Sequence, residues 1–264
     1  AASSDYPLRD VYKRQLTEWS PAVDALPAFP PSGIVQWLGL AAALLAGLLV
    51  VFLPFEIWRR HRAGTLDRKA VLEMLATASV SLPPLLVGGV VLAFYYWDHR
   101  CAHHFRPYWA MAHSVHHSSP QFDQTTALRV SLMDGAFSPW FYVPAVLVGF
   151  DPLLVAACFG VILTWQQWLH TETVCRLPWF DGWLNTPSNH RVHHGVQPQY
   201  IDRNYGAILM VWDRLFGTYA REDEPVRYGL TEPINSSNPW TVHTLEIGRW
   251  WRELRAAPTW RAFF

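Results

Sequence analysis

Long runs of residues without a charge are the feature that most limits how this chain can fold. Residues 33–55 and 74–97 form two such runs, of 23 and 24 residues, and both are largely apolar. A helix rises 1.5 Å per residue, so each run is long enough to cross a hydrocarbon core of about 30 Å. Charged residues make up only 16% of the chain, against about 25% in soluble proteins. The sequence therefore predicts an all-α integral membrane protein.

Two shorter apolar stretches, residues 135–150 and 152–169, follow later in the chain. Turn-forming residues separate them, which predicts a helical hairpin that enters the membrane and returns to the side that it left. With the two longer runs, this gives a bundle of about four membrane-embedded helices. Pro83-Pro84 interrupts the second run and should break or kink a helix there, because proline has no N–H to donate.

The remaining segments are too polar for hydrocarbon and are expected to form a helical cap outside it. Residues 98–134 and 171–264 are rich in histidine and tryptophan. Within them, residues 242–256 have the pattern of an amphipathic helix, lying either at the membrane interface or against the protein. The chain has 21 basic and 21 acidic residues, so it lacks the positive charge that drives nucleic-acid binding.

We expect a single domain over residues 16–264. Residues 10–15, Asp-Val-Tyr-Lys-Arg-Gln, read like a translated remnant of sequencing-library preparation, so residues 1–15 are interpreted as a non-native tail. The three cysteines are far apart and form no C-x-x-C pair, so the sequence predicts neither a disulfide framework nor a thiolate metal site.

Histidine is the residue with the most unusual distribution, since ten of the twelve lie between positions 99 and 194. They form the clusters His99-Arg-Cys-Ala-His103-His104, His113-Ser-Val-His116-His117 and His190-Arg-Val-His193-His194, with His170 alone. Residues three or four apart share one face of a helix, so each cluster can direct several imidazoles to one side. The two adjacent histidines of an H-x-x-H-H box diverge, so one box can serve two metal ions.

Metal binding is the chemistry that this pattern favours. Neutral imidazole binds Zn, Fe, Cu and Ni, but nine imidazoles exceed the four ligands of one tetrahedral zinc. Two divalent ions with four or five nitrogen ligands each fit the number. His104 is left open, and His61 and His243 are interpreted as ordinary polar residues. Nearby carboxylates are candidates to orient the ligands and offset the metal charge, or else ordinary caps and surface acids: Asp98, Asp123, Glu172, Asp202 and Asp213.

Over roughly residues 90–235 the chain resembles the membrane fatty acid hydroxylase/sterol desaturase superfamily. The motifs that carry the resemblance are Tyr96-Trp-Asp-His99-Arg, His113-Ser-Val-His116-His117-Ser-Ser, Thr126-Ala-Leu-Arg129, Asn185-Thr-Pro-Ser-Asn-His190-Arg-Val-His193-His194-Gly, Asn204-Tyr-Gly206 and Trp212-Asp-Arg-Leu-Phe-Gly-Thr218. Two further segments, Trp168-Leu-His170-Thr-Glu172 and residues 228–235, are most similar to the alkylglycerol monooxygenase branch.

The resemblance implies a membrane di-iron oxidoreductase that uses O2 and two electrons to hydroxylate or desaturate a fatty acyl, sterol or ether lipid. It implies two iron ions and no catalytic residue beyond their ligands, which would be His99, His103, His113, His116, His117, His170, His190, His193 and His194. The alkylglycerol monooxygenase branch has glutamate where His104 stands, which argues against a tetrahydropterin cofactor, and often has a further histidine where Asn189 stands.

The chain contains no cytochrome or ferredoxin pattern, so we expect a separate electron donor such as a cytochrome b5-like protein, a ferredoxin or a reductase. The segments that carry the boxes contain many arginines, so we expect the boxes on the cytoplasmic side of a multi-pass protein. The positive-inside rule would also place the basic residues 59–69 on that side, and a single span between them and the boxes would then put the boxes on the opposite side. Two other functions fit the same residues: a zinc-dependent membrane hydrolase and a non-catalytic metal-binding membrane protein.

Overall fold

The structure is a computed structural model that describes residues 58–65 and 67–257. All regular secondary structure in these residues is helical. The only strand-like pairings among them are two isolated bridges, Leu184 with Leu209 and Gly195 with Tyr228. The predicted all-α class is therefore confirmed for this part of the chain. The first apolar run, residues 33–55, and the interpreted tail, residues 1–15, lie outside the described residues.

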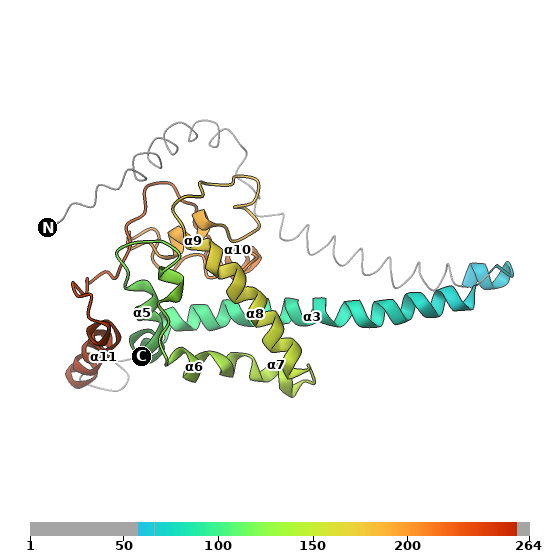
Figure 1. The fold of residues 1–264 in the computed structure, drawn as a ribbon, viewed down its shortest axis with the longest axis horizontal. Helices are drawn as coiled ribbons and strands as arrows, with labels where there is room; N and C mark the ends of the chain where they lie inside the picture. Colours follow the sequence, from blue (N-terminus) through green and yellow to red (C-terminus); the bar gives the residue numbers. More distant parts are fainter. Residues whose placement is uncertain (1–57, 66, 258–264) are drawn as a thin grey trace.

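Helix α3 (Arg68–His104) is the longest element, with 37 residues. It continues through Pro83-Pro84, so of the predicted break or kink the break is wrong. Each proline removes one hydrogen-bond donor, but the regular helical backbone on both sides carries the helix across the gap. Figure 1 shows that the first half of α3 extends beyond the other labelled helices, whereas its second half lies among them.

Helix α8 (Pro152–Leu169) crosses the second half of α3 (Figure 1). Val87 and Val91 of α3 pack with Val155 and Ile162 of α8, and all four side chains are at most 5% exposed. The helix has the bounds of the predicted stretch 152–169. The Asp151 carboxylate caps it by accepting a hydrogen bond from the N–H of Leu154 (2.9 Å), and proline occupies the first turn. This crossing joins the apolar part of the fold to the segments that carry histidines.

Residues 135–150 do not form the continuous helix that the hairpin prediction requires. They fold into three short pieces, α6 (Asp134–Phe137), the 3-10 helix η3 (Ser138–Phe141) and α7 (Val143–Leu147). Pro139 and Pro144 each lie in the first turn of a new piece, because a residue without an N–H fits there and not in a helix interior.

Helix α8 is the one helix among the described residues that has the length and hydropathy to cross a membrane. Its 18 residues have a mean hydropathy of 1.4, and only 22% of them are buried inside the protein. Leu153 (80% exposed) and Val161 (61% exposed) lie on its open face. The predicted bundle of about four membrane helices with a cap is therefore not confirmed, while one candidate span is present.

Helix α11 (Pro239–Ala256) corresponds to the predicted amphipathic segment 242–256, and it packs against the protein. Its contacts are with α4 (Arg106–Tyr108), the adjoining π-helix η1 (Trp109–His113) and α5 (Ser114–His117). The Arg106 guanidinium binds the carboxylates of Glu246 (3.0 Å) and Glu253 (2.7 Å) on α11. Trp240 and Trp251 remain 77% and 53% exposed, so one face of this helix is apolar and uncovered.

Candidate metal centre

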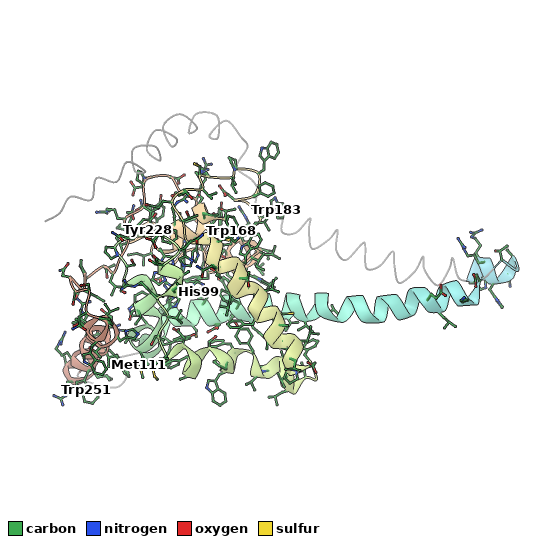
Figure 2. The ribbon with its side chains drawn as sticks, in the orientation of Figure 1. His99, Met111, Trp168, Trp183, Tyr228 and Trp251 are labelled. Carbon is green, nitrogen blue, oxygen red and sulfur yellow. The ribbon has the colours of Figure 1, made fainter. Side chains whose placement is uncertain are left out.

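Four segments bring histidines to one place in the fold. They are the end of α3, the continuous turns of η1 and α5, the residue after α8, and α9 (Pro187–His193). Helix α9 begins at Thr186, whose side chain caps it, and proline follows at the first position. Figure 2 shows His99 inside the body of the protein, and it is only 6% exposed.

Nine histidines form two groups, within each of which the potential ligand atoms lie within 4.8 Å of one another. Group 1 consists of His99, His103, His113, His117 and His193, and group 2 consists of His116, His170, His190 and His194. These are the nine residues that the sequence predicts as metal ligands, divided five and four.

Helical spacing explains the division. Residues four apart share a group, as for His113 with His117 and His190 with His194. The middle histidine of each H-x-x-H-H box, His116 or His193, joins the other group. The rings of His117 and His194, one from each group, stack at 4.2 Å between centroids. Each box therefore contributes to both groups, and the two groups adjoin.

The wide π-helical turn η1 precedes the second box and ends at His113. A π-helix contains one more residue per turn than an α-helix and changes the direction of the side chains that follow. Nε2 of His113 lies 3.1 Å from Nε2 of His99 and 3.2 Å from Nε2 of His117. His113 thus joins the histidines of α3 to those of α5.

Backbone carbonyls fix the outward nitrogen of several rings. Nδ1 of His99 donates to the carbonyl of Tyr205 (2.9 Å), and Nδ1 of His170 donates to that of Gln166 (2.8 Å). Nδ1 of His193 donates to the carbonyl of Arg203 (2.8 Å). A carbonyl can only accept, so in the neutral ring the proton lies on Nδ1 and a lone pair on Nε2. These contacts do not follow from the boxes themselves, although the Asn204-Tyr-Gly206 motif points to the segment that supplies two of them.

The inward nitrogens have distances that a shared cation explains. In group 2, Nε2 of His170 lies 3.2 Å from Nε2 of His116 and 3.0 Å from Nε2 of His190. Two nitrogens bound at about 2.1 Å to one cation are about 3.0–3.4 Å apart. Nε2 of His103, His193 and His194 is buried without a hydrogen-bond partner. Lone pairs that face one another away from water are unfavourable, and a cation at each group satisfies them.

Burial lowers the pKa of every histidine in the two groups. For His99 the pKa falls from 6.5 to about 3, and for His170 to about 4, in both cases mainly because burial disfavours the charged ring. Neighbouring rings lower the pKa further for histidines such as His113 and His194. The rings are therefore neutral at physiological pH, which is the form that binds a metal.

Of the five candidate carboxylates, Asp202 lies against a histidine ring, with its Oδ1 3.4 Å from Nδ1 of His103. Asp213 is one layer further out: it accepts the N–H groups of Tyr205 and Gly206 (both 2.7 Å) and so holds the segment that binds His99. Asp98 accepts hydrogen bonds from three hydroxyl groups, those of Tyr108, Ser138 and Tyr142.

The other two carboxylates are bound elsewhere. Asp123 accepts a hydrogen bond from the N–H of Thr125 (2.8 Å), and its charge offsets a small part of the lowering of the His170 pKa by burial. Glu172 is near Tyr228, whose pKa is raised mainly by burial and further by the charge of Glu172. Neither metal group contains a carboxylate among the described residues. Both groups therefore consist of nitrogen ligands alone, as the sequence predicts, and backbone carbonyls provide most of the contacts that orient the rings.

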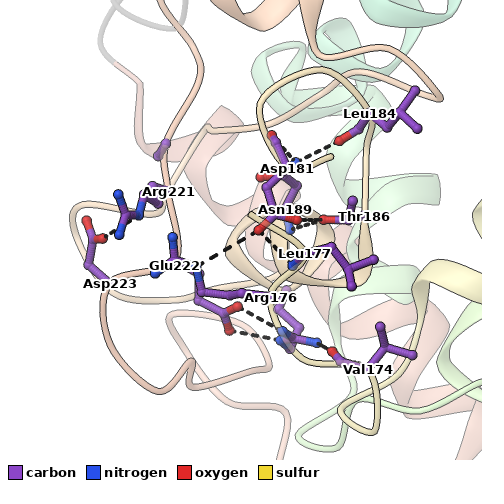
Figure 3. Close-up of polar contacts among 12 residues, drawn as sticks. Val174, Arg176, Leu177, Asp181, Leu184, Thr186, Asn189, Arg221, Glu222 and Asp223 are labelled. Carbon is purple, nitrogen blue, oxygen red and sulfur yellow. Dashed lines mark hydrogen bonds and ion pairs between the residues drawn. The ribbon is translucent and has the colours of Figure 1, made fainter. Parts of the chain in front are cut away.

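The histidines outside the nine belong to neither group among the described residues. His104 is exposed, and its Nε2 is 3.2 Å from the Tyr205 hydroxyl. His243 lies on α11, where its Nδ1 donates to the Pro239 carbonyl (2.8 Å). Asn189 is 1% exposed, and its side-chain N–H groups bind the carbonyls of Asp181 and Leu184. It therefore supports the start of α9 and is not directed to either group (Figure 3).

A buried ion pair holds α9 in place. Arg191, between two histidines of the third box, binds the Glu222 carboxylate through two hydrogen bonds of 2.8 Å, and both side chains are fully buried. The same guanidinium donates to the carbonyls of Thr171 (2.9 Å), the residue after His170, and Val174 (2.8 Å). The sequence offers no signal for this pair, because its members are 31 residues apart.

A cavity of about 610 Å³ reaches the centre from the side of α8. At its inner end lie His99, His113, His116, His170 and His190, from both groups. The walls are mostly apolar and include Tyr142, Val155, Phe159 and Leu163. A second, more polar cavity of about 440 Å³ meets the centre at His103, His117, His193 and His194, beneath α11. The centre is therefore open to an apolar molecule on one side and to polar solutes on the other.

Comparison with known proteins agrees with this arrangement. The chain is 44% identical over 164 residues to an alkylglycerol monooxygenase of Xenopus tropicalis, a match that covers 62% of this chain and 36% of that protein. The human alkylglycerol monooxygenase is 40% identical over the same shares of the two chains. An ornithine lipid hydroxylase of Rhizobium tropici is 31% identical over 53% of this chain and 43% of its own. No solved structure matches significantly.

The matches to the two alkylglycerol monooxygenases span about a third of their length. The model of the family described as fatty acid hydroxylase matches residues 85–218. That region is half of the chain and includes all nine histidines of the two groups. The chain belongs to the fatty acid hydroxylase family.

Proposed function

We propose that this protein is an O2-dependent di-iron hydroxylase or desaturase that oxidises a C–H bond of a membrane lipid. The observation that carries the proposal is the pair of adjoining imidazole groups, with Nε2 atoms as close as 3.0 Å, at the inner end of an apolar cavity. The names of the similar proteins, a monooxygenase and a lipid hydroxylase, support the same reaction class.

The residues present fit a pair of iron ions. Group 1 offers five nitrogen ligands and group 2 offers four, and imidazole is a common ligand of iron. Iron bound there would supply the activation of O2 that no amino-acid side chain provides. Hydroxylation consumes one O2, two electrons and two protons for each C–H bond converted to C–OH, and releases one water.

The protein itself positions and protects the reaction. The carbonyls of Tyr205, Gln166 and Arg203 hold the rings in one orientation and one tautomer. Asp202, beside His103, supplies negative charge that offsets part of the charge of two divalent ions. The apolar wall of the cavity excludes water and holds a lipid chain beside both groups, so the reacting carbon is fixed near the metals.

The lipid would reach the cavity from the bilayer, since the exposed apolar face of α8 forms part of the same region. We propose a multi-pass membrane protein with the centre on the cytoplasmic side, where reductants are available. The polar cavity beneath α11 gives protons and water a route to the centre that the apolar cavity does not provide. Electrons then come from a separate donor protein, and the exposed His104 in place of glutamate argues against tetrahydropterin.

The test is lipid analysis of host cells that express the protein under ¹⁸O2. We expect a membrane lipid with one ¹⁸O atom, or one additional double bond, that is absent from cells carrying the His116→Ala variant. The matched control is His243→Ala, which removes a histidine outside both groups and should leave the product unchanged. An unchanged lipid profile in cells with iron-loaded protein and its electron donor would contradict the proposal.

Metal dependence separates the two alternatives. A zinc hydrolase would release product under argon with zinc, whereas the proposed enzyme requires O2 and iron. A storage or sensor protein would show metal uptake that weakens in the His193→Ala variant, with no product from the wild-type protein. Either result would contradict the proposed reaction and assign a different function to the same histidines.

A further inference from the structure

Arg129, the last residue of the Thr126-Ala-Leu-Arg motif, lines the apolar cavity, and its side chain has no role in the centre described above. It follows the short 3-10 helix η2 (Thr126–Leu128), whose buried Thr126 fixes the turn by donating to the Gln121 carbonyl (3.1 Å). The neighbouring side chains of Leu128 and Val130 are 73% and 59% exposed. The charged side chain thus lies along the cavity while the apolar ones point outward, the reverse of the pattern in a water-soluble protein.

The guanidinium of Arg129 is incompletely satisfied. One terminal nitrogen donates to the Ser118 hydroxyl (2.6 Å), but the buried Nε has no hydrogen-bond partner. Burial lowers the pKa of this arginine, and no carboxylate offsets the effect. A buried N–H without an acceptor, on a charged group, is unfavourable unless a ligand supplies the acceptor.

The charged groups of the cavity are segregated. Asp98 and Asp134 lie near Tyr108, whose pKa is raised mainly by burial and further by both charges, while neither contributes to the pKa of Arg129. The Asp98 oxygens are occupied by three hydroxyl groups, and Asp134 accepts the N–H of Ser131 (3.0 Å). Among the described residues that line this cavity, Arg129 is the one arginine or lysine, and the two acids of the lining, Asp98 and Asp134, are hydrogen-bonded elsewhere.

Arg129 lies at the metal end of the cavity. The ring of His116, in group 2, hydrogen-bonds the backbone of Arg129, and Nε2 of His116 is 3.2 Å from that of His170. His170 follows α8 directly, whereas Pro152, at the opposite end of α8, also lines the cavity. Gln166 is fourteen positions after Pro152 on α8, and at 1.5 Å per position the apolar wall is about 21 Å long.

We propose that Arg129 binds an anionic oxygen, of a carboxylate or phosphate, at the polar end of the lipid substrate. A guanidinium matches such groups with paired hydrogen bonds. The lipid head then lies beside group 2, and its chain extends along α8 toward Pro152. The carbon that is oxidised is consequently a few bonds from the polar head and not at the end of the chain. This inference rests on the proposed function, because only that function makes the bound lipid a substrate.

The test is equilibrium binding of palmitate, hexadecyl phosphate and hexadecanol to the metal-loaded full chain in a neutral detergent. We expect the wild-type protein to bind the two anions at least about 10-fold more tightly than the alcohol, as for a charge-assisted hydrogen bond. Arg129→Gln should abolish this preference while hexadecanol still binds, which also shows that the variant is folded. Arg129→Lys should keep part of it, and Arg252→Gln on the exposed face of α11 should keep all of it.

A preference that persists in Arg129→Gln overturns the inference. Ser118→Ala, which removes the hydroxyl that holds the guanidinium, provides a second variant and should weaken the preference. Inorganic phosphate at equal concentration should not displace palmitate. Displacement would contradict the inference, because it would show that Arg129 binds free anions instead of the polar end of a lipid. Normal anion preference without any lipid oxidation contradicts only the proposed function, whereas lipid oxidation with an unchanged preference in Arg129→Gln contradicts only this inference.

Discussion

The substitution Glu222→Gln tests whether the buried ion pair holds the third histidine box in place. Glu222 and Arg191 are both fully buried and share two hydrogen bonds of 2.8 Å. Glutamine keeps the size of the side chain but leaves the guanidinium as a buried charge without a counter-charge. Removal of one partner of such a pair costs about 3–5 kcal/mol, in contrast to an exposed pair.

The expected result is a loss of thermal stability. A cost of about 3–5 kcal/mol corresponds to a fall in Tm of roughly 6–20 °C for a chain of this size. The assay is thermal unfolding of purified protein in detergent, with bound metal measured after each preparation. The matched control is Glu73→Gln, because Glu73 forms an exposed pair with Lys69 (3.8 Å) on α3 and should leave Tm unchanged.

A double variant refines the interpretation. Arg191→Met with Glu222→Leu removes both charges, which restores part of the stability that either single variant loses. The recovery is incomplete because the carbonyls of Thr171 and Val174 lose their donor. A Glu222→Gln protein with the Tm and metal content of the wild type would refute the reasoning, since it would show that the pair does not support α9.

Three further predictions follow from the orienting contacts. Gly206→Ala should lower Tm and bound metal, because its Cβ would lie 2.5 Å from the Leu209 carbonyl oxygen; Gly160→Ala on α8, which meets nothing within 4 Å, is the control. Asp202→Asn should weaken metal affinity by about 10-fold in an anaerobic titration, and unchanged affinity would assign Asp202 no orienting role. The metal-free protein should unfold more easily as pH falls below about 6.5. Its buried histidines have folded pKa values below the unfolded 6.5, so the unfolded chain takes up more protons; stability that is flat from pH 7 to 4 would contradict this.

Much of the centre could be predicted from sequence because its information is local. Histidines four residues apart share a group, as their place on one helix face predicts, and the adjacent histidines of each H-x-x-H-H box diverge into the two groups. The Asp151 cap and the start of α8 are local in the same way.

The sequence was less informative where tertiary contacts decide. Apolar composition alone does not distinguish a membrane span from the short helices α6, η3 and α7, whose breaks are set by Pro139 and Pro144. Pro83-Pro84, by contrast, does not end α3. The carbonyl of Tyr205 and the Arg191–Glu222 pair act across long sequence separations, so no periodicity reveals them.

The central claim is that two adjoining groups of imidazoles bind two iron ions. Its most direct test is anaerobic titration of the metal-free protein with Fe(II), followed by X-ray absorption at the iron edge. We expect two tightly bound equivalents per chain in shells of nitrogen ligands, and one equivalent after His103→Ala or His190→Ala has disrupted a single group. One equivalent or none in the wild-type protein, or a shell dominated by ligands other than histidine nitrogen, would contradict the claim.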